Sequence, residues 1–371
     1  MKRLGRIVGL VLLVFLCIIL IPLVNVVAEC RPWAQVNPGQ PENVVSAETE
    51  QIKAGLTDYP RPEDQTYLTL PEWYIVYSAD EYAAFVAENP PSRFPYFGAV
   101  RQYWRSYYDV CAITRQQYPF NSGYQLTLAV IGTSFTVENI LKGLYENTVG
   151  RLTEWLSSAE LTEEDAYARE VAKAYGDFIH TIPWYEFPFD EKLSGLWRET
   201  SPTGPNLIRK WERKLALSLE YGGKAGYAWL IKQGTQTAYA PENLEIQAWV
   251  EGVSAEVWQN EPQLRLVKTI SPETAIVAIP RYEAFTQIVP RLVRQGVRFV
   301  EIAGNDEILL TVIVPREWEY RLEMGQFLFA LDILSQPALK RIAVKVPVTS
   351  LHTVLAGLES SGAQLEHLYD Y

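Results

Sequence analysis

The sequence is poor in the side chains that most often bind metals or act as nucleophiles. Its 371 residues include three histidines and three cysteines, and no C-x-x-C pair is present. A thiolate zinc site is therefore excluded in practice. The chain also lacks a G-x-S-x-G nucleophile elbow, a G-x-x-x-x-G-K-[ST] phosphate loop and a G-x-G-x-x-G dinucleotide motif. It thus contains no recognisable catalytic motif, and we expect no cofactor.

Positive charge is also scarce. The chain carries 33 Lys and Arg against 44 Asp and Glu, so its net charge is −11 and its pI is about 5.0. Non-specific binding to nucleic acid requires Lys and Arg to neutralise phosphates. The composition therefore argues against a nucleic-acid partner.

The N-terminus carries the clearest pattern in the chain. Lys2, Arg3 and Arg6 precede residues 7–28, an apolar run without charge. A helix of roughly 20 apolar residues is long enough to cross a bilayer. Since the positive charge lies before the run, we expect a single-pass anchor with its N-terminus in the cytoplasm and the bulk of the chain outside.

A cleaved signal peptide is the alternative for the same residues. Pro22 and the small-residue stretch that ends at Ala28 are typical of a cleavage region, and cleavage there would release a periplasmic or secreted protein. Both interpretations place the bulk of the chain outside the cytoplasm. Cys30 and Cys111 would then share an oxidising compartment, and the sequence leaves open whether they pair.

Length and composition predict an α+β multidomain protein. Residues 29–66 are proline-rich and predict a spacer, and residues 67–240 predict a mainly helical domain. Thr69–Glu72 and Ser78–Glu81 match the capping box, which predicts a short helix that stops and restarts. We expect further helices over 94–117, 134–157, 157–182 and 205–232. The helix over 157–182 has a capping signal at Thr162.

Helix 134–157 has two contrasting faces. We expect its apolar face to pack in the core; this face comprises Phe135, Leu141, Leu144, Val149, Leu152 and Trp155. Glu138, Lys142, Glu146 and Glu154 form a charged ladder at helical spacing. We interpret the ladder as a solvated face with ion pairs worth about 0.3–0.5 kcal/mol each, and a proton relay is the alternative.

The C-terminal part changes to a strand period. The pattern of residues 241–270 fits both a strand and a helical turn, and we treat this segment as the join between the two domains. Residues 271–371 predict two β-α-β units, with strands at 274–280, 297–303, 340–347 and 363–371, and further strands at 307–315 and 326–334. A Gly-Asn-Asp turn between 297–303 and 307–315 predicts a hairpin. Two such units in one domain resemble a ferredoxin-like α+β sandwich.

Aromatic side chains are abundant, at 12% of the chain. Most are expected to be core residues, and Trp73, Val76 and Tyr77 share one face of a helix. Tyr74 and Tyr82 lie off that face and are candidate ligand-binding residues, because rings stack on sugars and sit at membrane interfaces. Trp184 and Tyr185, in the segment PWYEFPF at 183–189, are further candidates.

Two weaker patterns indicate chemistry. Glu186 is flanked by rings that would raise its pKa, which makes it a candidate catalytic acid. Asp177 and His180 form D-x-x-H and are candidate metal ligands, although a di-metal bundle needs two E-x-x-H motifs. A histidine supported by an aspartate near a helix end is the simpler interpretation.

The leading hypothesis is therefore a membrane-anchored extracytoplasmic protein with a non-catalytic binding or assembly role at the cell envelope. Its partners would be the membrane, through residues 7–28, and an envelope protein or a second copy. The alternatives are an exported enzyme, carbohydrate-active and with an aromatic-lined site, and a metal or haem carrier.

Overall fold

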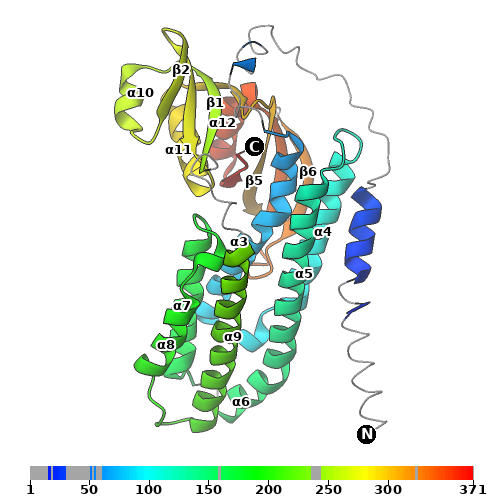
Figure 1. Cartoon of the computed structure of the whole chain (residues 1–371), viewed down its shortest axis with the longest axis vertical. Coiled ribbons are helices and arrows are strands. Elements are labelled where there is room, and N and C mark those ends of the chain that lie inside the picture. The colour runs from blue at the N-terminus through cyan, green and yellow to red at the C-terminus, as the bar shows by residue number, and fades with distance from the viewer. Residues whose placement is uncertain are drawn as a thin grey trace.

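The computed structural model describes residues 16–17, 20–30, 51, 54–55, 61–157, 160–234, 244–321 and 325–370. It is an α+β structure with a helical N-terminal half and a C-terminal region of two antiparallel four-stranded sheets (Figure 1). The helical half contains α3 (Asp64–Glu88), α4 (Tyr96–Thr114), α5 (Ser122–Tyr145), α6 (Arg151–Leu156), α7 (Glu163–Ile179), α8 (Phe189–Glu199) and α9 (Leu207–Gly234).

Helix α3 runs without interruption through the segment that was predicted to stop and restart. Both predicted capping boxes are therefore wrong. The hydroxyl of Thr69 donates to the carbonyl of Gln65 one turn earlier, and Pro71 lies inside the helix. Because α3 is packed between α4, α7 and a sheet, tertiary contacts outweigh these local signals. By contrast, the cap predicted at Thr162 is confirmed, since Thr162 and Asp165 form the capping box of α7.

The C-terminal region contains two sheets with the same strand order. The first has the order β2-β3-β1-β4 and the second β6-β7-β5-β8, and every pairing is antiparallel. The first sheet consists of β1 (Glu245–Glu251), β2 (Arg265–Ser271), β3 (Thr274–Pro280) and β4 (Arg298–Ile302), and the second of β5 (Glu307–Pro315), β6 (Gln326–Asp332), β7 (Leu339–Pro347) and β8 (Gln364–Leu368). The helices of this region are α10 (Ala255–Asn260), α11 (Glu283–Arg294) and α12 (Leu351–Ser361).

The two predicted β-α-β units exist, but they do not share one ferredoxin-like sheet. In each unit the two parallel strands flank the first strand of their own sheet, β1 or β5. The ambiguous residues 241–270 supply β1 and β2, which complete the first sheet. For this reason β4 pairs with β1 rather than with β5, and the predicted hairpin between 297–303 and 307–315 is wrong.

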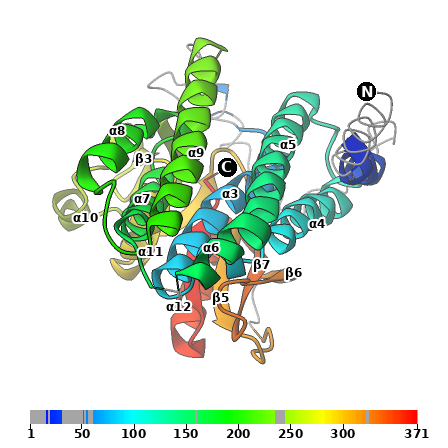
Figure 2. The same cartoon turned by 90° about the horizontal axis from the view of Figure 1, so that it is seen from below.

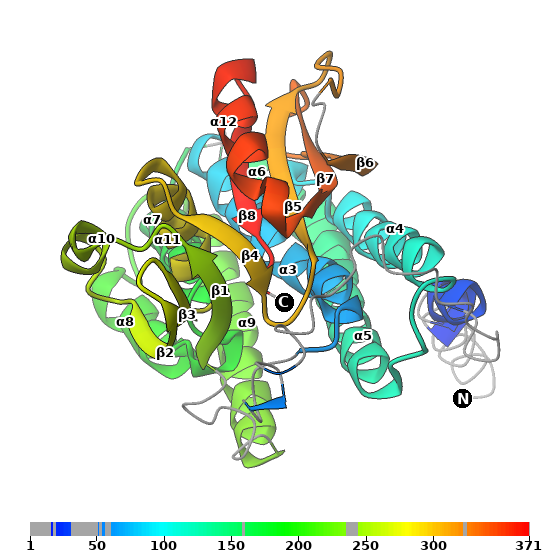
Figure 3. The ribbon, with the colours of Figure 1, turned by 90° about the horizontal axis from the view of Figure 1, so that it is seen from above.

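Helices α11 and α12 lie between the two sheets and share one apolar core with both (Figure 3). Alternate residues of each sheet point into this core, for example Ile246, Ala248 and Val250 on β1 and Ile308, Leu310 and Val312 on β5. The opposite face of the second sheet packs on the helical half. The molecule is therefore layered as helices, sheet, helix pair and sheet.

The aromatic segment of α3 forms the contact between the helical half and the second sheet. Tyr77, predicted to be a packing residue, is buried against the sheet, and its hydroxyl lies 2.8 Å from that of Tyr369 and 3.0 Å from Oγ1 of Thr311. The guanidinium of Arg341 covers the Tyr77 ring at 3.9 Å from its centroid. Tyr77 thus joins two parts of the fold, whereas Tyr74 packs within the helical half.

A helix at residues 20–30 packs beside α4 (Figures 1 and 2). A disulfide joins Cys30 to Cys111 of α4, with 4.6 Å between the Cα atoms. Among the described residues, no helix combines the length and apolar character needed to cross a bilayer. Much of the predicted anchor, and residues 31–50 of the predicted spacer, lie outside the described residues.

Candidate functional site

The candidate catalytic acid, Glu186, is half exposed in the middle of the PWYEFPF segment. Its carboxylate pairs with Lys232 of α9 at 2.9 Å. The neighbouring Trp184 ring stacks on Tyr227, with 5.2 Å between the ring centroids, and Tyr185 is buried. These residues thus fasten the segment to α9 rather than surround the acid.

The tyrosine candidates of α3 are packing residues. Tyr74 is buried between Tyr103 and Phe135, and its hydroxyl donates to Gln102 at 3.0 Å. Tyr82 lies under the ammonium of Lys142, which is 4.2 Å from the ring centroid. Burial raises the pKa of Tyr82, and Lys142 partly opposes that shift. The structure therefore places Tyr74 and Tyr82 in different environments and brings neither to Trp184.

His180 lies at the C-terminal end of α7, where the helical half meets α11. Its Nε2 is 2.7 Å from Asp80 of α3, and its Nδ1 is 3.3 Å from Glu283 of α11. Hydrogen bonds to these two carboxylates raise the pKa of His180 to about 10. The predicted partner Asp177 instead pairs with Lys173 on the exposed face of α7. In the described part of the chain, no three His, Cys, Asp or Glu side chains are arranged to hold a metal ion.

A second histidine, His367, lies nearby in a contrasting environment. It is buried, its ring centroid is 3.6 Å from that of Trp73, and its Nδ1 is 3.0 Å from Thr286. Burial lowers the pKa of His367 to about 3, which keeps the ring neutral. Sequence reasoning did not select this residue, because a lone histidine in a strand carries no motif.

The most unusual site in the helical half is a line of buried ion pairs along α9. We call it the charged core; its bases are Lys142, Arg209, Lys210, Arg213, Lys214 and Lys224, and its acids are Glu146, Glu164, Asp165, Glu212 and Glu220. Charged side chains are almost never fully buried unless they are paired. Here the pairs link α5, α7 and α9.

Arg213 and Arg209 occupy adjacent turns at the centre of the charged core. Arg213 donates to Glu146 at 2.9 Å and to Glu212 at 2.6 Å. Arg209 donates to Asp165 at 2.8 Å. Each guanidinium therefore bridges two segments of the chain through charge-assisted hydrogen bonds, which are stronger than neutral ones.

Lys142 extends the charged core toward the other end of α9. Its ammonium is 2.9 Å from Glu220, which also lies 3.4 Å from Lys224. Burial opposes ionisation of Glu220, but the two lysines outweigh it and lower the pKa of Glu220 to about 2. The carboxylate therefore stays ionised at neutral pH.

Glu146 begins a π-helical turn, Glu146–Gly150, between α5 and α6. Such turns are frequent at functional sites. A Cβ on Gly150 would collide with Oε2 of Glu146, so the glycine makes room for the buried carboxylate. Within the described residues, Oε2 has no hydrogen-bond partner, and burial raises the pKa of Glu146 against the opposing effect of Arg213.

The predicted orientation of this helix is therefore wrong. Lys142 and Glu146, expected on a solvated face, are turned inward, whereas Leu141, Leu144, Val149, Leu152 and Trp155, expected in the core, are exposed. The sequence held one signal that would have shown this: Arg209, Lys210, Arg213 and Lys214 alternate at helical spacing with large apolar residues of α9. Basic partners for the acids of the ladder were thus present.

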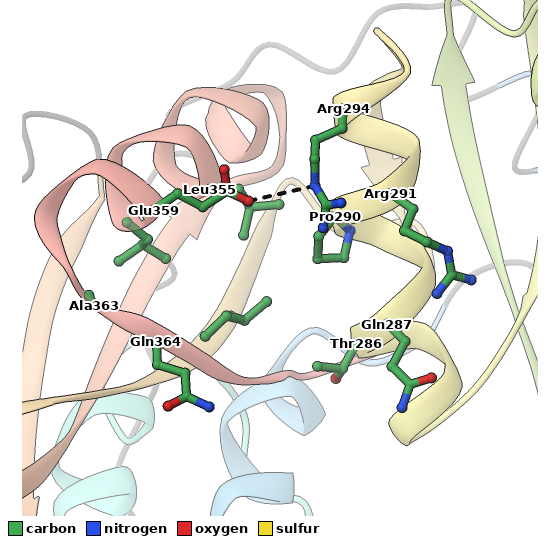
Figure 4. A pocket seen from close by; sticks show the side chains of 11 residues that line it. Thr286, Gln287, Pro290, Arg291, Arg294, Leu355, Glu359, Ala363 and Gln364 are labelled. Carbon is green, nitrogen blue, oxygen red and sulfur yellow. Dashed lines mark ion pairs between the residues drawn. The ribbon is translucent and has the colours of Figure 1, made fainter.

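A groove of about 480 Å³ lies between α11 and α12 in the sheet region (Figure 4). Leu355, Pro290 and Leu365 form part of its lining, and Arg294 reaches across to Glu359 with 3.6 Å between Nε and Oε1. The lining mixes these apolar side chains with polar ones, among them Gln287, Arg291 and Gln364.

Comparison of the chain with protein-family models, with curated proteins and with solved structures finds no match.

Proposed function

We propose that the chain is a membrane-anchored extracytoplasmic protein that has a binding or assembly role at the cell envelope. The disulfide between Cys30 and Cys111 is the observation that carries this proposal. Disulfides persist in exported proteins and are rare in the cytosol, where thiols are kept reduced. Cys30 follows directly after the apolar run 7–28, so this bond would hold the helical half next to the membrane.

The contacts of the helix at residues 20–30 support the same attachment. Val26 and Cys30 are buried on the helical half, and Glu29 pairs with Arg115 of α4. The opposite side of this helix exposes Ile21 and Val24. A helix that contacts protein on one side and lipid on the other would have this distribution.

The sheet region would carry the partner. Its groove between α11 and α12 has a volume within the roughly 300–1,000 Å³ of typical ligand clefts. The alternatives are less well supported by the contacts of their residues. Glu186 is half exposed and paired with Lys232, unlike the desolvated acid that the enzyme hypothesis requires, and both ring nitrogens of His180 face carboxylates.

A topology experiment tests the proposal directly. Protease added to cells after the outer barrier is opened should digest the full chain and leave a small anchored fragment. Complete protection of residues 60–371 would contradict the extracytoplasmic location.

The disulfide is tested separately by counting thiols. Free thiols in the full chain are blocked under denaturing conditions, the disulfide is reduced, and the new thiols receive a mass tag. We expect two tagged cysteines, and a Cys111→Ser variant should lose both tags. Three thiols blocked before reduction would remove the main support for export.

A further inference from the structure

Helix α9 exposes an apolar stripe on the side opposite its buried charges. Within Leu207–Leu230, all of which the structure describes, every exposed residue is Leu, Ile, Trp, Tyr or Gly. All seven charged residues of this stretch are turned inward or are only partly exposed. At 1.5 Å per residue, the stripe is about 36 Å long.

Helix α5 continues the same surface. Ion pairs between Lys142 and Glu220 and between Glu138 and Lys224 align α5 and α9 in opposite directions. Helical spacing places the exposed residues of both helices on one side of this line of pairs. We call this surface the apolar face and define it by Leu144 of α5, Trp155 of α6, and Ile208, Trp211, Leu215, Leu219 and Trp229 of α9.

The apolar face is large for a surface in contact with water. The side chains of Leu215 and Leu219 are 61% and 69% exposed, and Trp155, Trp211 and Trp229 are 75%, 46% and 64% exposed. Since a large aromatic side chain has roughly 150–250 Å² of surface, these tryptophans alone expose roughly 300–450 Å². The largest apolar patch of a typical monomer totals roughly 300–600 Å², and the leucines add to this sum.

We infer that the hydrocarbon region of a lipid bilayer covers the apolar face. This inference rests on the proposed membrane attachment. Paired charges inside and apolar side chains outside are the arrangement that a bilayer imposes, because ionisable groups face the interior of a membrane protein and tryptophan is enriched at its boundaries. Helix α9 turns its charges inward and its apolar side chains outward. Contact with lipid favours this arrangement, whereas contact with water does not.

The position of helix 20–30 identifies the occupant. This helix ends at Cys30, whose sulfur is 3.4 Å from Gln125 in the first turn of α5. Leu126 and Val130, on the following turns of α5, are exposed, as are Ile21 and Val24 on the helix itself. The segment expected in the bilayer thus adjoins α5, whose later turns carry the apolar face.

The opposite side of the helical half carries exposed charges. Lys173 and Asp177 of α7 are exposed and pair with each other at 2.6 Å. In Figure 2, α9 lies between α5 on one side and α7 and α8 on the other. The bilayer would therefore contact one face of this half, as in proteins that lie in the membrane interface, and the helices would not span it.

Lipid quenching of site-specific labels tests the inference in the full chain. A Cys17→Ser background, with the disulfide intact, receives a single cysteine at Leu144 or Leu219 and a small environment-sensitive fluorophore. The protein is placed in phosphatidylcholine nanodiscs with or without spin-labelled lipid. We expect lipid quenching several-fold stronger at both positions than at Lys173→Cys, the exposed control on α7. Iodide in the water should show the reverse order.

A label at Val24→Cys separates this inference from the proposed function. Lipid quenching at Val24 with iodide quenching at Leu144 and Leu219 would keep the anchor and overturn lipid contact by the apolar face. Shielding of Leu144 and Leu219 from both quenchers would also overturn it, because a second copy would then cover the face. Absence of lipid quenching at all positions, Val24 included, would contradict both the proposed membrane anchor and lipid contact by the apolar face. If a label at Leu144 or Leu219 disturbs cooperative unfolding of the protein, a label at Leu215→Cys takes its place.

Discussion

The core between the two sheets is apolar, whereas the helical half buries a line of charged side chains along α9 beside its apolar clusters. Between the two sheets, the core consists of aliphatic and aromatic residues such as Leu310, Val344 and Phe285. Along α9, the bundle encloses Arg209, Arg213 and their acids, and large apolar residues lie outside. Hydrophobic burial stabilises the first arrangement in water, whereas the second needs its ion pairs to be complete and its outer face to be covered.

This difference shows what a periodic pattern can report. Apolar residues at helical spacing identify the side of a helix that leaves water, but they do not identify its neighbour. In α11 the apolar side faces the protein core, and in α5 and α9 a large part of it faces outward.

The largest effect is expected when one partner of the charged core is removed. Arg213→Met leaves Glu146 buried without its guanidinium partner and leaves Glu212 with Arg209 alone, and stranding a buried charge costs about 3–5 kcal/mol. Urea unfolding of the full chain in mild detergent measures this change in the free energy of unfolding. The matched control is Arg294→Met at an exposed ion pair of α11, which should cost about 0–1 kcal/mol. Equal effects for the two variants would show that the charged core is hydrated.

Two leucine truncations compare the cores next. Leu310→Ala removes a fully buried side chain between the sheets and should cost about 2–5 kcal/mol. Leu219→Ala on the apolar face should change the free energy of unfolding by less than about 0.5 kcal/mol in detergent. The same urea titrations measure both, and a large cost at Leu219 would place that residue in a protein core.

The contact between the two regions is tested by Tyr77→Phe. Loss of the hydroxyl leaves Thr311 and Tyr369 with one hydrogen-bond partner fewer, at a cost of about 1–3 kcal/mol. Tyr227→Phe, which loses an exposed bond to Ser134, serves as the control and should cost less than about 0.5 kcal/mol. If the two variants unfold at the same urea concentration, the contact through α3 does not stabilise the fold.

Much of the fold was predictable because local signals agree with the tertiary contacts. Strands β3 and β7 have continuous apolar runs, and Gly296 and Gly362 adopt positive φ after α11 and α12, a conformation that favours glycine. The division into two sheets was not predictable, since β1 pairs across the chain with both β3 and β4. Local periodicity carries no information about such partners.

The site residues were harder to predict for a related reason. His180 was selected with Asp177, three positions earlier on the same helix, whereas its carboxylates come from α3 and α11, about 100 residues away in each direction. Likewise, the acids of the charged core were visible as a ladder, but their bases lie on α9. Ion pairs between distant segments need the fold before they can be assigned.

The smallest expected effects distinguish the two histidines by their opposite dependence on pH. The pKa of His180 is raised to about 10, so its contribution to stability is complete below its ordinary pKa of about 6.5 and is lost as pH rises through 10. The pKa of His367 is lowered to about 3, so its contribution is complete above about 6.5 and is lost as pH falls toward 3.

Replacement of each histidine should therefore flatten a different limb of the stability profile. His180→Gln should cost about 1.5–3 kcal/mol at pH 6, the range for hydrogen bonds to charged groups, and lose the decline between pH 7 and 10. His367→Gln should instead reduce the loss of stability between pH 6 and 4, because the unfolded chain no longer gains a proton there. Urea titrations at each pH measure both limbs, with the unsubstituted chain as reference. An unchanged alkaline limb in His180→Gln would mean that Asp80 and Glu283 do not hold a charged imidazole between α3 and α11.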